Sequence, residues 1–268
     1  MRDTREAHGR DGADRAADAR INRDLWRVVN EQYTDGQAAD RWRSDAIVWG
    51  IYDIPEQQVD VLGDVSGLDI VELGCGTAYF SAWLARRGGR PVGLDVSEAQ
   101  LATARRCQQS FGIAFPLVEA DATAVPLADD SFDLVLSEYG ASLWCEPSAW
   151  IAEAARLLRP GGRLVFLTNS VLVSLCVPDD EGPATTVLAR GQHEVRRIHW
   201  SDGGVEFHPG HGELMGHLRD NGFIVESLQE LLAPPDAQRH GYYEIAEPGW
   251  GRRWPVEDLW TARLAGPT

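Results

Sequence analysis

The sequence of 268 residues predicts an α/β fold with a doubly wound, mostly parallel sheet. Three observations support this prediction. Ile70–Leu73 is a short apolar run, as expected for a buried parallel strand. Gly74 and Gly76 follow directly, and from Phe80 onward apolar residues recur with the period of a helix. The same alternation of strand and helix continues to Thr168, which is typical of a sheet covered by helices on both faces.

The segment before the first strand differs in composition from the rest. Residues 1–20 are rich in Arg, Asp, Ala and Gly and have no apolar period, so we expect a disordered tail there. Residues 21–62 are rich in aromatic side chains, and we expect one helix around Leu25–Gln32 and another over Ala38–Ile47. We interpret this segment as a helical lid over the ligand end of the sheet. An ordinary role in the core is the alternative for each aromatic residue.

Residues 63–268 are expected to form the main domain, whose first part supplies five strands. These strands are expected at Ile70–Leu73, Pro91–Leu94, Phe115–Glu119, Phe132–Ser137 and Arg163–Thr168. Ser97 should cap the helix after the second strand, with Gln100 completing a capping box. Pro160 and the two glycines after it should end the helix before the fifth strand.

The alternation ends after the fifth strand. We expect residues 169–210 to be an insertion near the substrate pocket, with a helix near Ala184–Arg190. A hairpin should pair Val195–Trp200 with Val205–His208. Three more elements bring the sheet to seven strands: a helix over Glu213–Asn221 and strands over Phe223–Leu231 and Leu259–Leu264.

Composition disfavours several classes of protein. The formal net charge is −16, which disfavours a nucleic-acid partner because phosphate contacts dominate such binding. We expect no membrane partner, because no stretch reaches the roughly eighteen apolar residues that a spanning helix needs. The four cysteines lie far apart without a C-x-x-C pair, a pattern that suits neither a zinc site nor a disulfide framework. We therefore expect no metal, reduced thiols and a cytoplasmic protein.

The strand, glycine turn and helix predict a nucleotide-like ligand on the turn. Asp95 closes the second strand, at the distance from the glycines where an acid accepts hydrogen bonds from a ribose. Both NAD and S-adenosylmethionine contain such a ribose. Two features separate them: the turn Gly74–Ala78 lacks the third glycine of the full dinucleotide fingerprint, and Glu72 places a negative charge just before the turn. A carboxylate there suits a ligand with an ammonium group better than one with a pyrophosphate.

Four motifs, in this order, carry a resemblance to a known family. They are Val71–Thr77, Gly93–Ser97, Glu119–Ala122 together with Ser131–Val135, and Leu157–Leu164. In these motifs the sequence resembles the class I S-adenosylmethionine-dependent methyltransferases of the small-molecule type. The resemblance covers about residues 30–264 and departs from many members at Ala78. It implies the Rossmann-like methyltransferase fold and S-adenosylmethionine as cofactor.

The resemblance also implies which residues bind the cofactor. They are Glu72, Gly74, Cys75, Gly76, Thr77, Asp95, Val96, Asp121, Ala122 and Ser137. The glycine turn should lie against the methionine part, Glu72 should orient its amino group, and Ser137 should help to close that end. Asp95 should hold the ribose and Val96 should pack on the adenine. Asp121 should accept a hydrogen bond from the adenine amine, with the Ala122 N–H donating to the ring.

The predicted function is transfer of a methyl group to a small molecule by in-line displacement. Such a reaction needs alignment and exclusion of water, and it needs a base only if the acceptor loses a proton. The candidates are Glu138 and Tyr139 after the fourth strand and His208 on the hairpin. Each could instead be a packing residue, and Glu138 could simply bind cofactor. The aromatic lid and the acidic composition favour an apolar or cationic acceptor.

Three alternatives stay open at this point. The chain could be a methyltransferase of RNA or protein, a nicotinamide-dependent oxidoreductase, or a non-catalytic protein that binds the cofactor. The sequence fixes neither the acceptor nor the oligomeric state.

Overall fold

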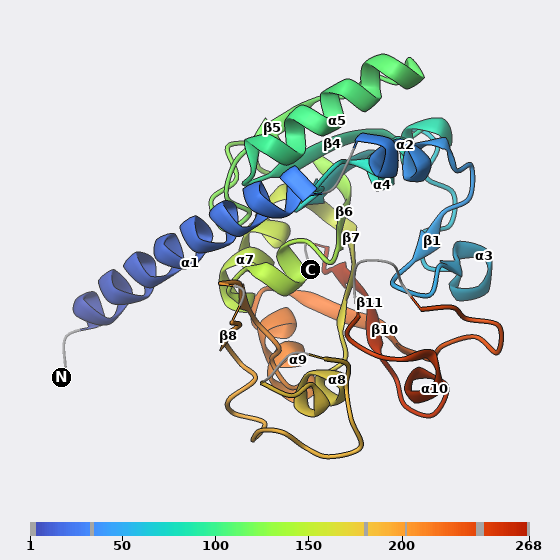
Figure 1. Ribbon diagram of the computed structural model, residues 1–268. Helices are drawn as coiled ribbons and strands as arrows, with labels where there is room; N and C mark the ends of the chain where they lie inside the picture. Colours follow the sequence, from blue (N-terminus) through green and yellow to red (C-terminus); the bar gives the residue numbers. More distant parts are fainter. Residues whose placement is uncertain (1–3, 33–34, 180–181, 202, 240–243, 267–268) are drawn as a thin grey trace.

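The structure, a computed structural model, describes residues 4–32, 35–179, 182–201, 203–239 and 244–266 (Figure 1). Its centre is a seven-stranded sheet with the strand order β10-β11-β7-β6-β3-β4-β5. Five of these strands run parallel: β3 (Asp69–Leu73), β4 (Arg90–Asp95), β5 (Leu117–Glu119), β6 (Phe132–Glu138) and β7 (Leu158–Asn169). The predicted doubly wound, mostly parallel sheet is confirmed.

Strand β3 lies at the point where the strand order reverses. It pairs with β4 on one side and with β6 on the other. Ligands of such sheets bind at the carboxyl ends of the strands beside this reversal. All five predicted parallel strands are present, but β7 begins at Leu158 instead of Arg163, because a bulge in the ladder lets Leu158 pair with Phe132.

Two antiparallel strands complete the sheet, β10 (Phe223–Leu231) and β11 (Glu257–Leu264). β11 runs antiparallel to both β10 and β7, and its register places Glu257 opposite Asn169. The first residue of β11 therefore lies at the carboxyl edge of the parallel strands. Both strands were predicted, and β11 begins two residues earlier than expected.

Helices cover both faces of the sheet. They include α4 (Tyr79–Arg86), α5 (Glu98–Phe111), α7 (Pro147–Leu157) and α9 (His211–Asp220). Successive strand residues point to opposite faces. Ile70 accordingly packs in one buried cluster with Trp83 of α4, and Val71 packs in another with Trp150 of α7. No helix in the described ranges is long and apolar enough to cross a membrane.

The N-terminal segment is more ordered than expected. It forms the helices α1 (Thr4–Gln32) and α2 (Asp35–Arg43). The disordered tail predicted for residues 1–20 is therefore wrong from Thr4 onward, and residues 1–3 lie outside the described part. Long-range contacts explain the error: the Asp18 carboxylate pairs with Arg197 at 2.5 Å, and the Asn22 side chain bonds to the backbone of Val205. A polar sequence without apolar period gives no sign of such contacts.

The chain between α2 and the sheet contains three short elements. They are β1 (Val48–Trp49), β2 (Ile54–Pro55) and α3 (Glu56–Val59). The helix expected over Ala38–Ile47 is present as α2 but ends at Arg43. Trp49 and Trp42 are fully buried, so the alternative role of these aromatics in the core holds for both.

The segment after β7 is largely irregular. Its elements are α8 (Val171–Cys176), β8 (Ile198–His199) and β9 (Val205–Glu206). The two strands pair as the predicted hairpin but are shorter than expected, and residue 202 of the turn is not described. The helix predicted near Ala184–Arg190 is wrong. The N–H groups of Ala184 and Thr185 donate to distant carbonyls, those of Ile245 and Cys176, instead of to a helical ladder. Two further short helices are α6 (Ala141–Trp144) and α10 (Pro248–Gly251).

Candidate cofactor and acceptor site

The two glycines of the turn have different structural roles. Gly74 has a φ of +78°, and a Cβ there would lie 2.5 Å from the Cα of Gly140. Gly74 is therefore required where the turn after β3 crosses the turn after β6. Gly76 has a φ of +53°, but its nearest neighbour would be the Gln100 side chain at 3.8 Å. The turn is thus open at Gly76, the position from which a ligand can approach the backbone.

Asp95 joins the end of β4 to this turn. One carboxylate oxygen accepts from the Gly76 N–H and the other from the Ser97 N–H, both at 2.8 Å. Burial raises the pKa of Asp95, and these hydrogen bonds oppose the rise. The predicted capping box is wrong, because Ser97 precedes α5 without a side-chain capping bond. The Ser97 hydroxyl is instead buried without a partner among the described residues, so it leaves a polar group free beside Asp95.

Glu72 connects β3 with the start of α4. Its Oε2 accepts from the backbone N–H of Ser81 at 2.9 Å and from the Ser81 hydroxyl at 2.5 Å. Burial raises the pKa of Glu72 to about 8, with Glu138 and Asp95 adding to the rise. Burial therefore favours the neutral carboxyl, and a cation that binds beside it would favour the charged form. A ligand with an ammonium group fits such a position.

The adenine end of the predicted site lies against α1. Asp121 makes a turn, since its Oδ1 accepts from the Thr123 N–H and hydroxyl, each at 2.8 Å. Beside it is a small cavity of about 10 Å³, lined also by Trp144 and, from α1, by Arg15 and Asp18. At the end of β4, the Val96 carbonyl accepts from Arg23 of α1, and Ala122 is buried. The adenine contacts of Val96, Asp121 and Ala122 stay predictions.

Helices α1 and α2 thus lie over the carboxyl edge of the sheet (Figure 1). The Trp42 indole N–H donates to the Thr77 carbonyl at 2.8 Å, which attaches α2 directly to the glycine turn. Cys75 is buried, and Ser137 is fully buried with its hydroxyl donating to the Leu73 carbonyl. Ser137 therefore holds the two turns together in the protein.

Glu138 and Tyr139 lie where they were expected, at the end of β6. The Glu138 carboxylate accepts from the Tyr79 hydroxyl at 2.7 Å and from the Gly50 N–H at 3.3 Å. Burial raises the pKa of Glu138. Tyr139 has a φ of +51°, a conformation that few residues other than glycine adopt, and its hydroxyl donates to Glu257.

Glu257 was missed by the sequence analysis. It is 0 % exposed, accepts from the Ile51 N–H at 2.7 Å, and has a buried Oε2 without a partner among the described residues. Burial raises the pKa of Glu257 to about 7. A Cβ on Gly50 would lie 2.1 Å from its Oε1, so the glycine makes room for the carboxylate. The sequence signal was an acid pair, Glu257 and Asp258, at the start of an otherwise apolar strand.

His208 does not belong to this group. Its Nδ1 lies 3.0 Å from the Ser174 hydroxyl, and its Nε2 lies 2.9 Å from Glu206. The side chain is fully buried, so both ring nitrogens are used for packing the insertion. The structure thus brings Glu138 and Tyr139 together with Glu257 and leaves His208 elsewhere. Among the described residues, no group of three His, Cys, Asp or Glu side chains could hold a metal ion.

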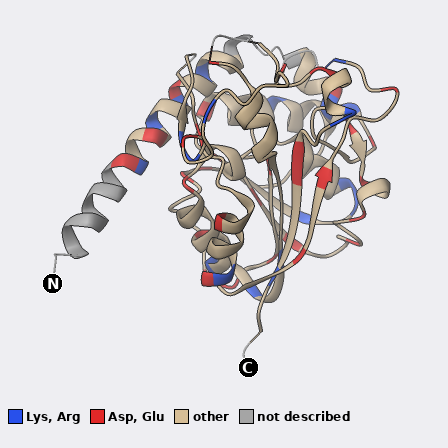
Figure 2. Ribbon diagram, turned by 90° about the horizontal axis from the view of Figure 1, so that it is seen from below, with Lys and Arg blue, Asp and Glu red and all other residues tan. Residues whose placement is uncertain are grey.

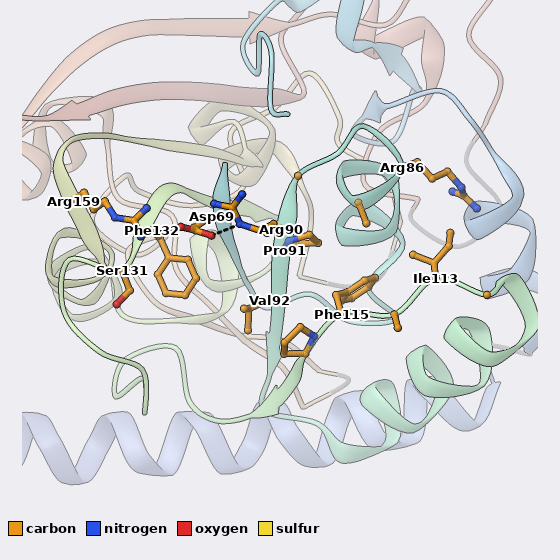
Figure 3. Close-up of a pocket in the computed structure, with 15 residues that line it drawn as sticks. Asp69, Arg86, Arg90, Pro91, Val92, Ile113, Phe115, Ser131, Phe132 and Arg159 are labelled. Atoms are coloured by element: carbon orange, nitrogen blue, oxygen red, sulfur yellow. Dashed lines mark hydrogen bonds and ion pairs between the residues drawn. The ribbon is translucent and has the colours of Figure 1, made fainter. Parts of the chain in front are cut away.

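A cavity also lies at the opposite edge of the sheet, at the amino ends of the strands. It has a volume of about 740 Å³ and is lined by Phe115, Phe132 and three arginines (Figure 3). Two of these, Arg90 and Arg159, already pair with Asp69 at 2.7 and 2.9 Å. Because α/β sheets bind ligands at the carboxyl ends of their strands, this cavity is not the cofactor site.

Comparison with known proteins agrees with the geometry. Residues 71–166 match the model of a methyltransferase domain. The solved structure of an S-adenosylmethionine dependent methyltransferase from Mesorhizobium loti is 28% identical, with a TM-score of 0.62, over 80% of this chain and 100% of that one. Residues 71–166 thus match a methyltransferase domain, and the fold of the chain is the Rossmann-like fold of the S-adenosylmethionine-dependent methyltransferases. In this family the cofactor is S-adenosylmethionine. The open turn at Gly76, buried Glu72 and the unpartnered Ser97 hydroxyl beside Asp95 fit its methionine and ribose parts.

Two curated relatives share the central segment of this chain. A demethylmenaquinone methyltransferase from Clavibacter sepedonicus is 41% identical over 102 residues, which are 38% of this chain and 41% of the relative. Methyltransferase GfsG from Streptomyces halstedii is 40% identical over 148 residues, which are 52% of each chain. The chain therefore spans about half the length of these relatives.

Proposed function

We propose that this chain catalyses transfer of a methyl group from S-adenosylmethionine to a small-molecule acceptor. The observation that carries the proposal is the arrangement at the carboxyl edge of the sheet. There the glycine turn is open at Gly76, Asp95 holds that turn, and buried carboxyl groups continue along the neighbouring strands. One of the relatives above is named for a small molecule, demethylmenaquinone, which supports this class of acceptor.

The residues at this edge have separate tasks in the proposed reaction. When bound, the cofactor supplies an activated methyl group on a sulfonium, which is already a good leaving group. Glu72 orients the amino group of the cofactor, and Asp95 orients its ribose. The α1 and α2 helices cover the site and exclude water, so that the acceptor meets the methyl group in a fixed geometry.

Calorimetry and a turnover assay test the proposal. We expect the full chain to bind S-adenosylhomocysteine and not NAD. We also expect it to form S-adenosylhomocysteine from S-adenosylmethionine with at least one acceptor from a panel of phenols, hydroxynaphthalenes, carboxylic acids, amines and thiols. Binding of NAD alone would support the nicotinamide-dependent oxidoreductase. Tight binding without turnover would support the non-catalytic alternative.

The acidic surface argues against RNA as the acceptor. The chain carries 41 acidic against 25 basic residues, and its basic positions are interspersed with acidic ones (Figure 2). A phosphate backbone would meet repulsion from such a surface. We further propose that the protein works in a reducing compartment such as the cytoplasm, because the four cysteines, all among the described residues, form no disulfide.

A further inference from the structure

Among the residues that the structure describes, the buried carboxylate of Glu257 has one hydrogen-bond partner with which it can exchange a proton. Its hydrogen-bond donors are the backbone N–H of Ile51 and the hydroxyl of Tyr139. A backbone amide does not give up its proton near neutral pH, whereas a phenol can pass its proton on while it receives another. Glu257 is fully buried, but Tyr139 is only half-buried. Tyr139 is therefore a partly exposed residue whose phenol hydroxyl contacts a buried carboxylate.

The backbone fixes Tyr139 in this position. Its φ of +51° is a sparsely populated conformation, and the next residue, Gly140, is locked against Gly74 of the cofactor turn. Such a conformation persists only when the surroundings determine it, and it is found preferentially at functional sites. Here it directs the phenol from the turn after β6 to the start of β11, along the edge where the acceptor must bind.

We propose that Tyr139 and Glu257 together form the base of the methyl transfer, an inference that rests on the function proposed above. Tyr139 takes the hydroxyl proton of the acceptor as the acceptor oxygen bonds to the methyl carbon. The carbon–sulfur bond breaks at the same time, and its electron pair stays on sulfur. Glu257 takes the phenol proton of Tyr139. Charge balances, because a sulfonium and a carboxylate become a neutral thioether and a neutral carboxylic acid.

This pair identifies the class of acceptor. The acceptor is a molecule whose attacking oxygen carries a proton at neutral pH, such as a phenol or an enol. Tyr139 is the catalytic residue because it touches the acceptor, and Glu257 is a positioning residue that acts through it. An acceptor that enters the site as an anion, such as a carboxylate, would need neither.

Other ionisable groups surround the pair. Glu138 at the end of β6 and Asp53 in the turn between β1 and β2 both repel the Glu257 charge. Arg41 of α2 pairs with Asp53 at 2.5 Å and faces Glu138, so it balances part of this repulsion. Tyr52 lies nearby, with its hydroxyl donating to the Ala246 carbonyl at 3.0 Å. Burial, together with the charges of Glu138 and Asp53, keeps the Glu257 carboxylate a stronger base than an exposed one.

The test compares Tyr139→Phe, Glu257→Gln and the control Tyr52→Phe, which also removes a tyrosine hydroxyl in this region. For the hydroxyl acceptor found by the panel, we expect kcat of the wild type to rise with pH through about pH 7. Tyr139→Phe and Glu257→Gln should each lower kcat by about 100-fold or more and abolish this rise. Tyr52→Phe should leave the profile unchanged. Glu257→Gln keeps an oxygen that accepts from Tyr139, so it tests proton transfer even if Tyr139→Phe does not fold.

The outcomes separate this inference from the function it rests on. A purely structural pair would change KM or stability but leave the pH dependence of kcat intact, which would overturn the inference. Acceptors that are all aprotic or anionic would also overturn it while leaving the methyltransferase function in place. A chain that binds no S-adenosylhomocysteine would refute the function itself, and the inference with it.

Discussion

Replacing Asp95 with Ala should weaken cofactor binding without unfolding the protein. The Asp95 carboxylate is 8 % exposed and already holds the Gly76 and Ser97 amides at 2.8 Å, so the substitution removes both the ribose acceptor and the group that shapes the turn. A hydrogen bond to a charged group contributes about 1.5–3 kcal/mol. Since about 1.4 kcal/mol corresponds to a factor of ten, the Kd for S-adenosylhomocysteine should rise about 10-fold to 150-fold.

The assay is isothermal titration of S-adenosylhomocysteine into the wild type and the variant. Asp133→Ala is the matched control, because Asp133 is a partly buried acid on the same sheet that pairs with Arg159 at 2.7 Å at the opposite edge. This control should cost some stability and leave Kd within about two-fold, because the effects of distant sites are nearly independent. A folded Asp95→Ala variant with the Kd of the wild type would refute the ribose role of Asp95.

Three further predictions concern stability. Gly50→Ala should lower the free energy of unfolding in urea by about 2–5 kcal/mol, because the new Cβ would overlap Glu257 and the φ of residue 50 is +68°. The control Gly63→Ala has a φ of +62° and open space around its Cβ, so it should cost only the backbone strain of about 1–2 kcal/mol. Asn22→Ala should cost about 1–3 kcal/mol, because it removes three hydrogen bonds that hold α1, two of them buried. No change in the urea midpoint would argue against a docked α1. Burial raises the pKa of Glu72 to about 8, so the unfolded state ionises first and stability should fall as the pH rises from about 5 to 8. Glu72→Gln should make this fall shallower in thermal unfolding measured across that pH range. An unchanged slope would contradict the burial of the Glu72 carboxyl.

The sequence predicted those parts of the fold that depend on local pattern. The strand β3, its glycine turn and Asp95 follow from apolar runs, glycine conformation and spacing, and each was predicted in place. The helix expected around Leu25–Gln32 is present as the last part of α1. The part of α1 before it was missed because Asp18 and Asn22 are fixed by partners more than 120 residues away in the chain. Glu257 was missed for the same reason, since only the antiparallel pairing of β11 brings it to the end of β7.

His208 illustrates the opposite error. A histidine on a hairpin beside a predicted pocket favours a catalytic role, because imidazole titrates near neutral pH. The fold instead gives both ring nitrogens a buried partner. Chemistry inferred from residue type holds only when the tertiary structure leaves the group accessible, and here it leaves Tyr139 accessible and encloses His208.

Three glutamates at the carboxyl edge, two buried and one partly buried, depart from the rule that acidic side chains stay exposed. Glu72, Glu138 and Glu257 come from β3, β6 and β11, and burial raises the pKa of each. Burying an acid destabilises a fold, and packing alone would be served as well by glutamine or an apolar residue. Proteins retain a destabilising charged group of this kind at sites where the charge has a function. Binding of a cationic cofactor by Glu72 and acceptance of a proton by Glu257 are functions of that kind, and both side chains lie along one edge of one sheet.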